Sequence, residues 1–161
     1  VDETVCRESD PLAHAGLLAR LKAKVVWDKY PDSLVLGCDQ VMWDGVRIHG
    51  KPKDAESHFR MLVSLRGKDH WLHSAYCLWA STGMEERVVT SRLRVREDLS
   101  DAEIQAYVDT KEGRFCAGGY AIEGHGAWLF SEVEGDWTNI IGLPVFEVIG
   151  SLRRMGWTYG G

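Results

Sequence analysis

The stretch Leu34-Val-Leu-Gly-Cys-Asp-Gln-Val41 is a short apolar run that ends on an acid and an amide. Its first three residues have the continuous apolarity of a strand buried on both faces, which indicates a parallel or mixed sheet covered by helices. Asp39 is then expected at the carboxyl end of this strand. Ligands of open α/β sheets bind beyond the carboxyl ends of strands, so Asp39 is a candidate for chemistry. Asp is also common in turns, and the spacing alone leaves both interpretations open.

The segment before this strand predicts a helix. Asp10 can cap its first turn, Pro11 suits its first position, and the helix is expected to run to about Trp27. Its apolar face is expected to carry Leu17, Leu18, Leu21 and Val25. Lys22 and Lys24 fall at or beyond the edge of that face, so the helix alone predicts that both are solvated.

The segment after the strand predicts a hairpin. Asp44-Gly45 supplies the positive φ angles of a type I′ turn between Val41 and Ile48. A hairpin that folds back can return the tripeptide Gly50-Lys51-Pro52 toward Asp39, and Pro52 stiffens the exit. Lys51 could therefore be presented near the carboxylate.

The rest of the chain alternates helical and strand-like patterns. Helices are expected over 54–66, from the capping box at Ser100 onward, and over 145–155, with strands over 70–80 and 87–95. The last helix is expected to bury Val145, Val148, Ile149 and Leu152. The glycine-dense stretch 116–130 predicts a bulged strand, in which Gly124 and Gly126 could let the backbone approach a ligand. It matches neither a Walker A loop nor a dinucleotide-binding fingerprint.

Three arginines alternate along the second strand: Arg92, Arg94 and Arg96. Such a stripe could face an anionic substrate, or it could be the solvated side of a half-buried strand. The pattern alone does not decide between these alternatives.

The composition predicts one soluble α/β domain. The chain has 161 residues and 45% hydrophobic content, enough to bury a core, and no run approaches the roughly 18 apolar residues of a membrane span. With no signal peptide visible, a cytoplasmic location is expected. The four cysteines form no C-x-x-C pair, so reduced thiols are expected. A net charge of −5 argues against nucleic acid or anionic membranes as partners. An anionic substrate would need a few gathered cations and a divalent metal.

Taken together, an ordered set of short motifs resembles the Maf family of septum-formation-associated nucleotide pyrophosphatases. The motifs are Asp2-Glu-Thr4, Leu21-Lys-Ala23, Gly37-Cys-Asp-Gln-Val41, Gly50-Lys-Pro52, Ala117-Gly-Gly-Tyr120, Glu123-Gly124 and Ile141-Gly-Leu-Pro144. The resemblance covers essentially the whole chain. It implies an inosine-triphosphate-pyrophosphatase-like mixed sheet flanked by helices, with a central cleft between two lobes. It also implies hydrolysis of a nucleoside triphosphate to the monophosphate and pyrophosphate, with Mg²⁺ or Mn²⁺, often by a homodimer.

The resemblance also implies roles for individual residues. Asp39 matches the catalytic acid that accepts a proton from water, and Glu3 matches the acid that helps Asp39 to hold the metal. Lys22 and Lys51 match two lysines that contact phosphates, which differs from the solvated position that the helix pattern alone gives Lys22. Arg96 matches a family arginine and is expected to bind substrate. Attack on a triphosphate needs a positioned water, a base and cations, which these residue types supply.

The substrate is expected to be read by Gln40 and Glu123. This combination resembles the subgroup that acts on 7-methylguanosine triphosphate, and a carboxylate can accept hydrogen bonds from a guanine N1–H and amino group. Tyr120-Ala-Ile122 is closer to the pyrimidine type, so dTTP or UTP is the alternative substrate.

The front of the chain departs from the family pattern. Family members open with a strand and a Ser-Pro-Arg-Arg-type loop before the Asp-Glu-Thr motif, and the sequence shows neither. The single Maf-like domain over residues 1–161 is therefore expected to lack its first strand and phosphate-binding loop. Either the sequence is part of a longer chain, or it is a catalytically weakened nucleotide-binding or cell-division regulatory module.

Overall fold

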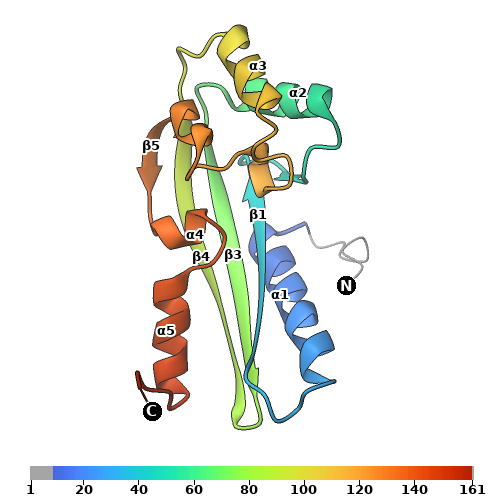
Figure 1. Cartoon of the computed structure of the whole chain (residues 1–161), viewed down its shortest axis with the longest axis vertical. Helices are drawn as coiled ribbons and strands as arrows, with labels where there is room; N and C mark the ends of the chain where they lie inside the picture. Colours follow the sequence, from blue (N-terminus) through green and yellow to red (C-terminus); the bar gives the residue numbers. More distant parts are fainter. Residues whose placement is uncertain (1–8, 161) are drawn as a thin grey trace. The chain divides into compact units, whose positions relative to one another are not determined.

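The protein is an α/β structure in which helices surround one sheet (Figure 1). The computed structural model describes residues 9–160. The sheet has five strands in the order β2-β1-β3-β4-β5. They are β1 Val35–Trp43, β2 Ile48–His49, β3 Asp69–Ala80, β4 Gly83–Val95 and β5 Phe130–Glu134. The predicted α/β class is confirmed. The β1–β2 and β4–β5 pairs are both antiparallel, where a mixed sheet was expected.

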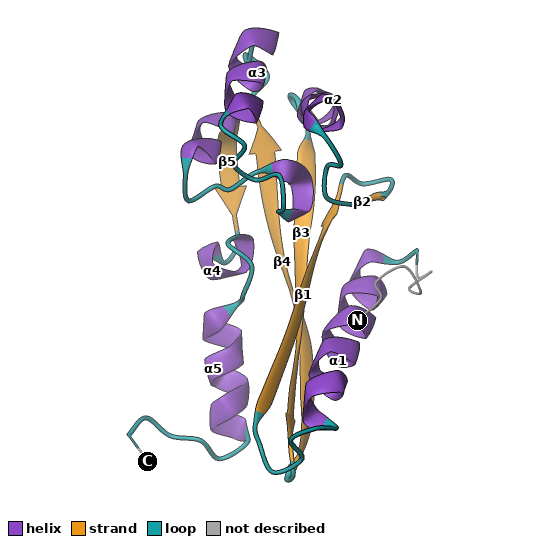
Figure 2. Cartoon of the chain, turned by 45° about the vertical axis from the view of Figure 1, so that its right-hand side comes forward, coloured by secondary structure: helices purple, strands orange, loops and turns teal. Residues whose placement is uncertain are grey.

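Five α-helices and the 3₁₀ segments η2 and η3 accompany the strands in the described part of the chain (Figure 2). The helices are α1 Pro11–Trp27, α2 Ala55–Leu65, α3 Asp101–Asp109, α4 Trp137–Ile140 and α5 Val145–Arg154, and the 3₁₀ segments are η2 Ala117–Gly119 and η3 His125–Leu129. None of the described helices is long and apolar enough to cross a membrane. By internal contacts the chain divides into two compact units. Unit 1 comprises residues up to Gln40, 73–89 and from 136 onward, and unit 2 comprises 41–72 and 90–135.

In unit 1, helices pack on both faces of the strands. On one face, Ala23 of α1 packs with Val35 of β1 and Cys77 of β3. On the other face, Tyr76 and Leu78 of β3 pack with Val148 of α5. Neighbouring residues of β3 thus join different clusters, as the alternation of side chains along a strand requires. Figures 1 and 2 show α1 and α5 on opposite sides of these strands.

Helix α1 lies unusually close to β1. A Cβ atom on Gly37 would stand 2.4 Å from the carbonyl oxygen of Ala19 and 2.5 Å from the backbone nitrogen of Ala23. Only glycine in the strand and small residues on the helix permit this approach. The contact sets which side of α1 faces the sheet.

The bounds predicted for α1 are confirmed, and Asp10 caps it by accepting a hydrogen bond from the Ala13 N–H. The predicted apolar face was wrong, because Leu17 and Val25 are 40% and 47% exposed. The buried residues are Pro11, Ala15, Leu18, Ala19 and Ala23. The strand prediction also needs a correction, since Leu36 is 40% exposed. Helices cover both faces of β1 in unit 1, but its side chains are not all buried.

Unit 2 contains the two helices with complete capping boxes, α2 and α3. Asp54 and Ser57 cap α2, and Ser100 and Glu103 cap α3, as the sequence predicted for the latter. A turn at Asp44-Gly45 is also confirmed, with Gly45 at φ +94°. The predicted type I′ form is wrong, because Asp44 does not adopt the positive φ angle that this turn type requires.

The glycine-dense stretch is not the predicted bulged strand. It forms the 3₁₀ segments η2 and η3, and only from Phe130 does the chain enter β5. Gly118 and Gly119 have φ angles of +78° and +76°, which are incompatible with an extended strand.

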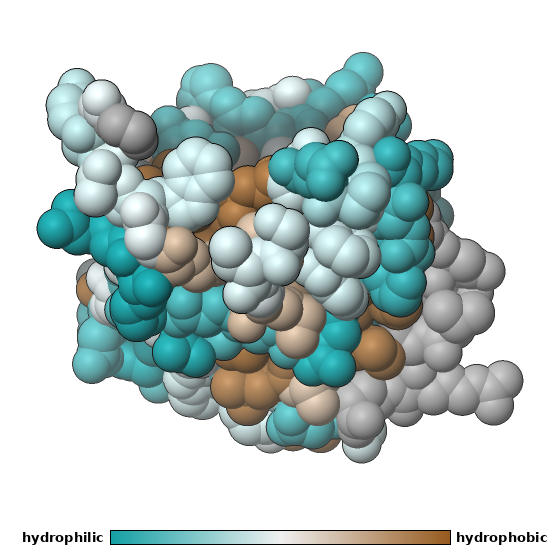
Figure 3. Space-filling model, turned by 90° about the horizontal axis from the view of Figure 1, so that it is seen from below, coloured by the Kyte–Doolittle hydropathy of each residue, from teal (hydrophilic) through white to brown (hydrophobic). Residues whose placement is uncertain are grey.

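Several apolar side chains of α4 and α5 in unit 1 remain exposed. Phe146 is 70% exposed and Trp137 is 49% exposed. Val145 and Ile149, which were predicted to be buried, are 37% and 48% exposed, whereas Val148 is buried as predicted. In the space-filling view from below, hydrophobic areas are small and separated by polar ones (Figure 3).

Candidate active site

Asp39 and Lys22 form an ion pair in unit 1. Asp39 follows Gly37 on the same face of β1, so it points toward α1, where Lys22 Nζ donates to Asp39 Oδ1 at 2.6 Å. The Lys22 and Asp39 side chains are 31% and 9% exposed. An ammonium at this distance favours the ionised carboxylate. The pair therefore presents a carboxylate that can accept a proton or bind a cation.

Lys22 is less solvated than the helix pattern predicted, and the phosphate contact that the family resemblance implies for it stays a prediction. Its neighbour Lys24 pairs with Asp28 at 2.7 Å on the surface, where both side chains are 51% exposed. The solvated prediction was therefore correct for Lys24 and wrong for Lys22. The prediction for Lys22 failed because the apolar face predicted for α1 is not the face that packs against the sheet.

Gln40 points to the opposite face of β1 from Asp39. Its side-chain Nε2 donates to Ser74 Oγ at 2.9 Å and to the backbone carbonyl of Asn139 at 2.7 Å. Ser74 and Asn139 are both fully buried. The Gln40 amide nitrogen thus links β1 to β3 and α4, which gives it a structural role.

Cys38, beside Asp39, is a neutral thiol. Burial, together with the neighbouring Asp39 carboxylate, raises its pKa to about 11. Its Sγ donates to the Gly142 carbonyl at 3.4 Å. A thiol with such a pKa is not a nucleophile at neutral pH.

In unit 2, the charges of Lys51 and Glu123 both affect the pKa of the Cys116 thiol. Burial raises the pKa of the Cys116 thiol, the Glu123 carboxylate raises it further, and Lys51 lowers it. Charges exert such effects over short distances, so these two predicted site residues lie near one thiol. Lys51 and Glu123 are both exposed.

The segment that carries Glu123 is held by Glu112. Its carboxylate accepts from the His125 backbone N–H at 2.8 Å and contacts His125 Nδ1 at 2.7 Å. A Cβ on Gly124 would stand 2.8 Å from this carboxylate, and one on Gly126 would stand 2.3 Å from the Ala121 carbonyl oxygen. These glycines therefore allow close approach to the protein itself, where approach to a ligand was predicted.

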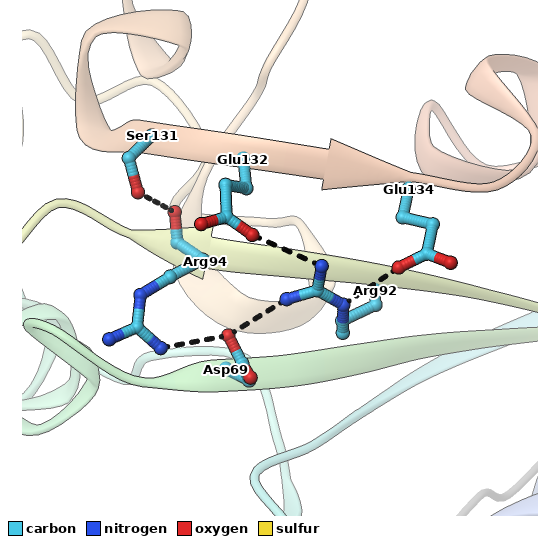
Figure 4. Close-up of polar contacts among 6 residues, drawn as sticks. All are labelled: Asp69, Arg92, Arg94, Ser131, Glu132 and Glu134. Carbon is cyan, nitrogen blue, oxygen red and sulfur yellow. Dashed lines mark hydrogen bonds and ion pairs between the residues drawn. The ribbon is translucent and has the colours of Figure 1, made fainter.

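The arginine stripe is neutralised by carboxylates of the same sheet (Figure 4). Arg92 contacts Glu134 at 3.0 Å and both Glu132 and Asp69 at 3.1 Å. Arg94 contacts Asp69 at 3.1 Å, and the two arginines hold the pKa of Asp69 below its usual value. For Arg92 and Arg94 the solvated-side interpretation is therefore supported over a substrate-facing one.

Arg96 is separate from these two arginines. It binds the Asp98 carboxylate through Nε and Nη2, at 2.9 and 2.8 Å. It lines a cavity of about 280 Å³ with the exposed Trp128, and that cavity contains none of the other predicted site residues. Its role toward substrate stays a prediction.

A divalent metal was predicted at Glu3 and Asp39, and Glu3 lies outside the described residues. The described residues contain no group of three or more His, Cys, Asp or Glu placed to hold a metal ion. Mg²⁺ binds proteins through one or two carboxylates and takes its other oxygens from water and substrate phosphates. The Asp39 carboxylate fits such a site as one ligand.

Sequence reasoning missed the residues that position the pair. Gly37 of β1 packs closely against Ala19 and Ala23 of α1. The Gln40 side chain donates to the Ser74 hydroxyl and to the Asn139 carbonyl. The sequence did contain a signal for the Gly37 contact. A glycine inside a strand indicates close backbone approach, and the preceding helix carries alanines four residues apart.

An α/β fold with a lysine–aspartate pair on β1 agrees with the class of protein that the motifs implied. Asp39 lies in the middle of β1 and not at the carboxyl end of the strand, where it was predicted, because the strand continues to Trp43 and pairs there with β2. A family model for Maf-like proteins matches residues 1–155. A dTTP/UTP pyrophosphatase of Pyrococcus furiosus is 37% identical over 149 residues, covering 92% of this chain and 78% of the relative. One of Myxococcus xanthus is 38% identical over 156 residues, covering 97% and 79%. One of Syntrophotalea carbinolica is 40% identical over 153 residues, covering 92% and 69%. The chain belongs to the Maf family.

Proposed function

We propose that this chain hydrolyses a pyrimidine nucleoside triphosphate, dTTP or UTP, to the monophosphate and pyrophosphate. The chain is a nucleotide pyrophosphatase by its family and by the names of its relatives. The observation that carries the finer proposal is that relatives matched over nearly the whole chain are named dTTP/UTP pyrophosphatases. The names give no support to the expected preference for 7-methylguanosine triphosphate. That expectation rested partly on Gln40, whose side-chain nitrogen is hydrogen-bonded within the protein.

The chemistry follows from the Lys22–Asp39 pair. Water attacks the α-phosphorus, the bond to the bridging oxygen breaks, and that oxygen leaves with pyrophosphate. Asp39, kept ionised by Lys22, accepts the proton of the water. Lys51 binds phosphate oxygens, and Arg96 is a further candidate for substrate contact. Asp39 would help to hold a divalent Mg²⁺ or Mn²⁺, which would supply positive charge to neutralise the triphosphate.

Glu123 is the candidate for reading the base. An ionised carboxylate only accepts hydrogen bonds, and uracil and thymine each offer one ring N–H. Its segment is held by Glu112, and the Glu123 carboxylate raises the pKa of the Cys116 thiol in the same unit. The proposed assembly is a homodimer, which light scattering on the purified protein tests.

The activity is tested with a substrate panel. The full chain is incubated with Mg²⁺ and dTTP, UTP, CTP, GTP or 7-methylguanosine triphosphate, and pyrophosphate release is followed. We expect the highest kcat/KM with dTTP or UTP. Highest efficiency with the methylated purine would overturn the pyrimidine assignment, and no release from any nucleotide would overturn the enzyme itself.

The Asp39→Asn variant tests the catalytic base. Loss of a general base lowers rates by about 10²–10⁴-fold, so we expect kcat to fall in that range with folding retained. The matched control is Asp28→Asn, which breaks the exposed Lys24–Asp28 pair at the C-terminal end of α1, the helix that carries Lys22. This control should leave kcat unchanged. Equal activity of both variants would remove Asp39 from this role.

A further inference from the structure

A second group of cations lies in unit 2, around a cavity of about 220 Å³. This cavity contains none of the residues assigned to the candidate active site. Its wall includes Lys53, Asp54, His58, Lys111, Arg114 and Phe115. Three of these side chains are permanently cationic at neutral pH, and they come from two segments far apart in the chain.

These three cations differ from most arginines of the described structure, which pair with carboxylates. The paired ones are Arg20, Arg47, Arg60, Arg66, Arg87, Arg92, Arg94, Arg96 and Arg154. Within residues 9–160, Lys53, Lys111 and Arg114 have no ion-pair partner. In a protein of net charge −5, uncompensated positive charge gathered in one cavity indicates an anionic ligand.

The one carboxylate of the wall is already engaged. Asp54 caps α2 and accepts from the Ser57 backbone N–H at 2.7 Å. The positive end of the α2 dipole also lies at this wall, because the helix begins at Ala55. His58 is buried, and its Nε2 donates to the Gly119 carbonyl, so its ring is a fixed part of the wall.

Two further features favour a built site. Lys111 has a φ of +62°, and it is the one non-glycine residue with positive φ in the described chain. Glycine or asparagine normally occupies such a position after a helix, so the lysine there has a strained backbone. Phe115 is 70% exposed, with the Arg114 guanidinium 4.3 Å from its ring centroid.

We propose that this cavity binds the phosphate group of an anionic small molecule, with Lys53, Lys111 and Arg114 contacting its oxygens. Lysine and arginine are the common partners of phosphate in proteins. The phosphate could belong to inorganic pyrophosphate or to a nucleotide whose base lies against Phe115. The inference does not depend on the proposed hydrolysis, since it rests on charges and contacts of unit 2 alone.

The test is a titration of the full chain at constant ionic strength, followed by NMR of the backbone amides of residues 53–58 and 108–115. We expect inorganic pyrophosphate to shift these signals saturably. The double variant Lys111→Gln/Arg114→Gln should weaken binding at least tenfold. The matched control Lys29→Gln/Arg153→Gln removes two unit-1 cations that also lack ion-pair partners among the described residues, and it should bind as the wild type does.

Further variants separate this cavity from the candidate active site and distinguish the two ligand sources. The shifts should persist in Lys22→Gln, and their loss there would overturn the proposal by assigning them to substrate binding. Uridine monophosphate that binds more tightly than pyrophosphate, with the difference abolished by Phe115→Leu, identifies a nucleotide. Pyrophosphate binding at least as tightly identifies the inorganic anion. Absence of saturable shifts with both ligands, or unchanged binding by Lys111→Gln/Arg114→Gln, would overturn the proposal.

Discussion

At the scale of single residues, Asp39 and Gln40 show how one position along a strand separates two roles. They are neighbours in sequence, but alternation turns Asp39 toward Lys22 on α1 and Gln40 toward Asn139 on α4. The sequence places both at the site because their motif is continuous. The structure commits the Gln40 amide nitrogen to two protein acceptors.

The variant Gln40→Glu tests this structural role. A carboxylate has no N–H, so Ser74 Oγ and the Asn139 carbonyl would lose their donor and face a negative charge. We expect the free energy of unfolding to fall by about 1–3 kcal/mol, measured by urea denaturation. Unchanged stability together with an altered nucleotide preference would instead make Gln40 a substrate contact.

Glu123 can be examined at the same scale. Glu123→Gln retains the shape of the side chain but adds an amide donor, so it changes which edge of a base the side chain can bind. We expect a changed ratio of kcat/KM between UTP and 7-methylguanosine triphosphate, with the melting temperature within a few degrees of the wild type. An unchanged ratio would show that Glu123 does not read the base.

At the scale of elements, the contact between α1 and β1 positions the Lys22–Asp39 pair. Gly37→Ala would place a Cβ 2.4 Å from the Ala19 carbonyl and must push the helix away. We expect a loss of stability of about 1–3 kcal/mol and a lower kcat, because displacement of α1 carries Lys22 away from Asp39.

The same helix offers a matched control for this prediction. Gly16, within α1, has no atom within 4 Å of an added Cβ. Gly16→Ala should therefore raise stability by roughly 0.5–1 kcal/mol and leave kcat unchanged. Similar behaviour of the two alanine variants in urea denaturation and turnover would contradict the close-packing explanation.

Sequence patterns predicted the bounds of these elements better than their faces. The capping signals at Asp10 and Ser100 act within one turn, so they can be read locally. The face of α1 depends on its fit to Gly37, which a hydrophobic stripe does not reveal because alanines contribute little to it. The glycines of η2 were equally ambiguous, since glycine tolerates both extended and positive-φ backbone.

At the scale of the whole molecule, motif order carried information that periodicity did not. The Maf resemblance identified the family, whereas neither Asp39 nor Lys51 could be assigned a role from spacing alone. Lys22 and Asp39 belong to unit 1, and Lys51 and Glu123 belong to unit 2. The motifs are distributed over both units, and their order along the chain, not any single motif, identified the family.

The pH dependence of global stability is expected to report on His70, which is fully buried in β3 and bonded through Nε2 to the Tyr120 hydroxyl at 2.7 Å. Burial lowers the pKa of His70 from 6.5 to about 4. Between these values the unfolded chain binds more protons than the folded chain. The contribution of His70 is therefore complete above pH 6.5 and is lost progressively as the pH falls to 4, by roughly 3 kcal/mol in all.

The comparison that isolates this effect is with His70→Gln, whose amide can still bond to the Tyr120 hydroxyl but does not titrate. The variant is expected to be less stable at pH 7, because the fully buried site of residue 70 must repack around a side chain of different shape. Between pH 6.5 and 4, urea denaturation should show the wild type losing stability by up to about 1.4 kcal/mol per pH unit more than the variant. Groups that titrate in both proteins and do not act on His70 cancel in this difference. Parallel pH profiles would mean that His70 takes up its proton as readily in the folded chain as in the unfolded one.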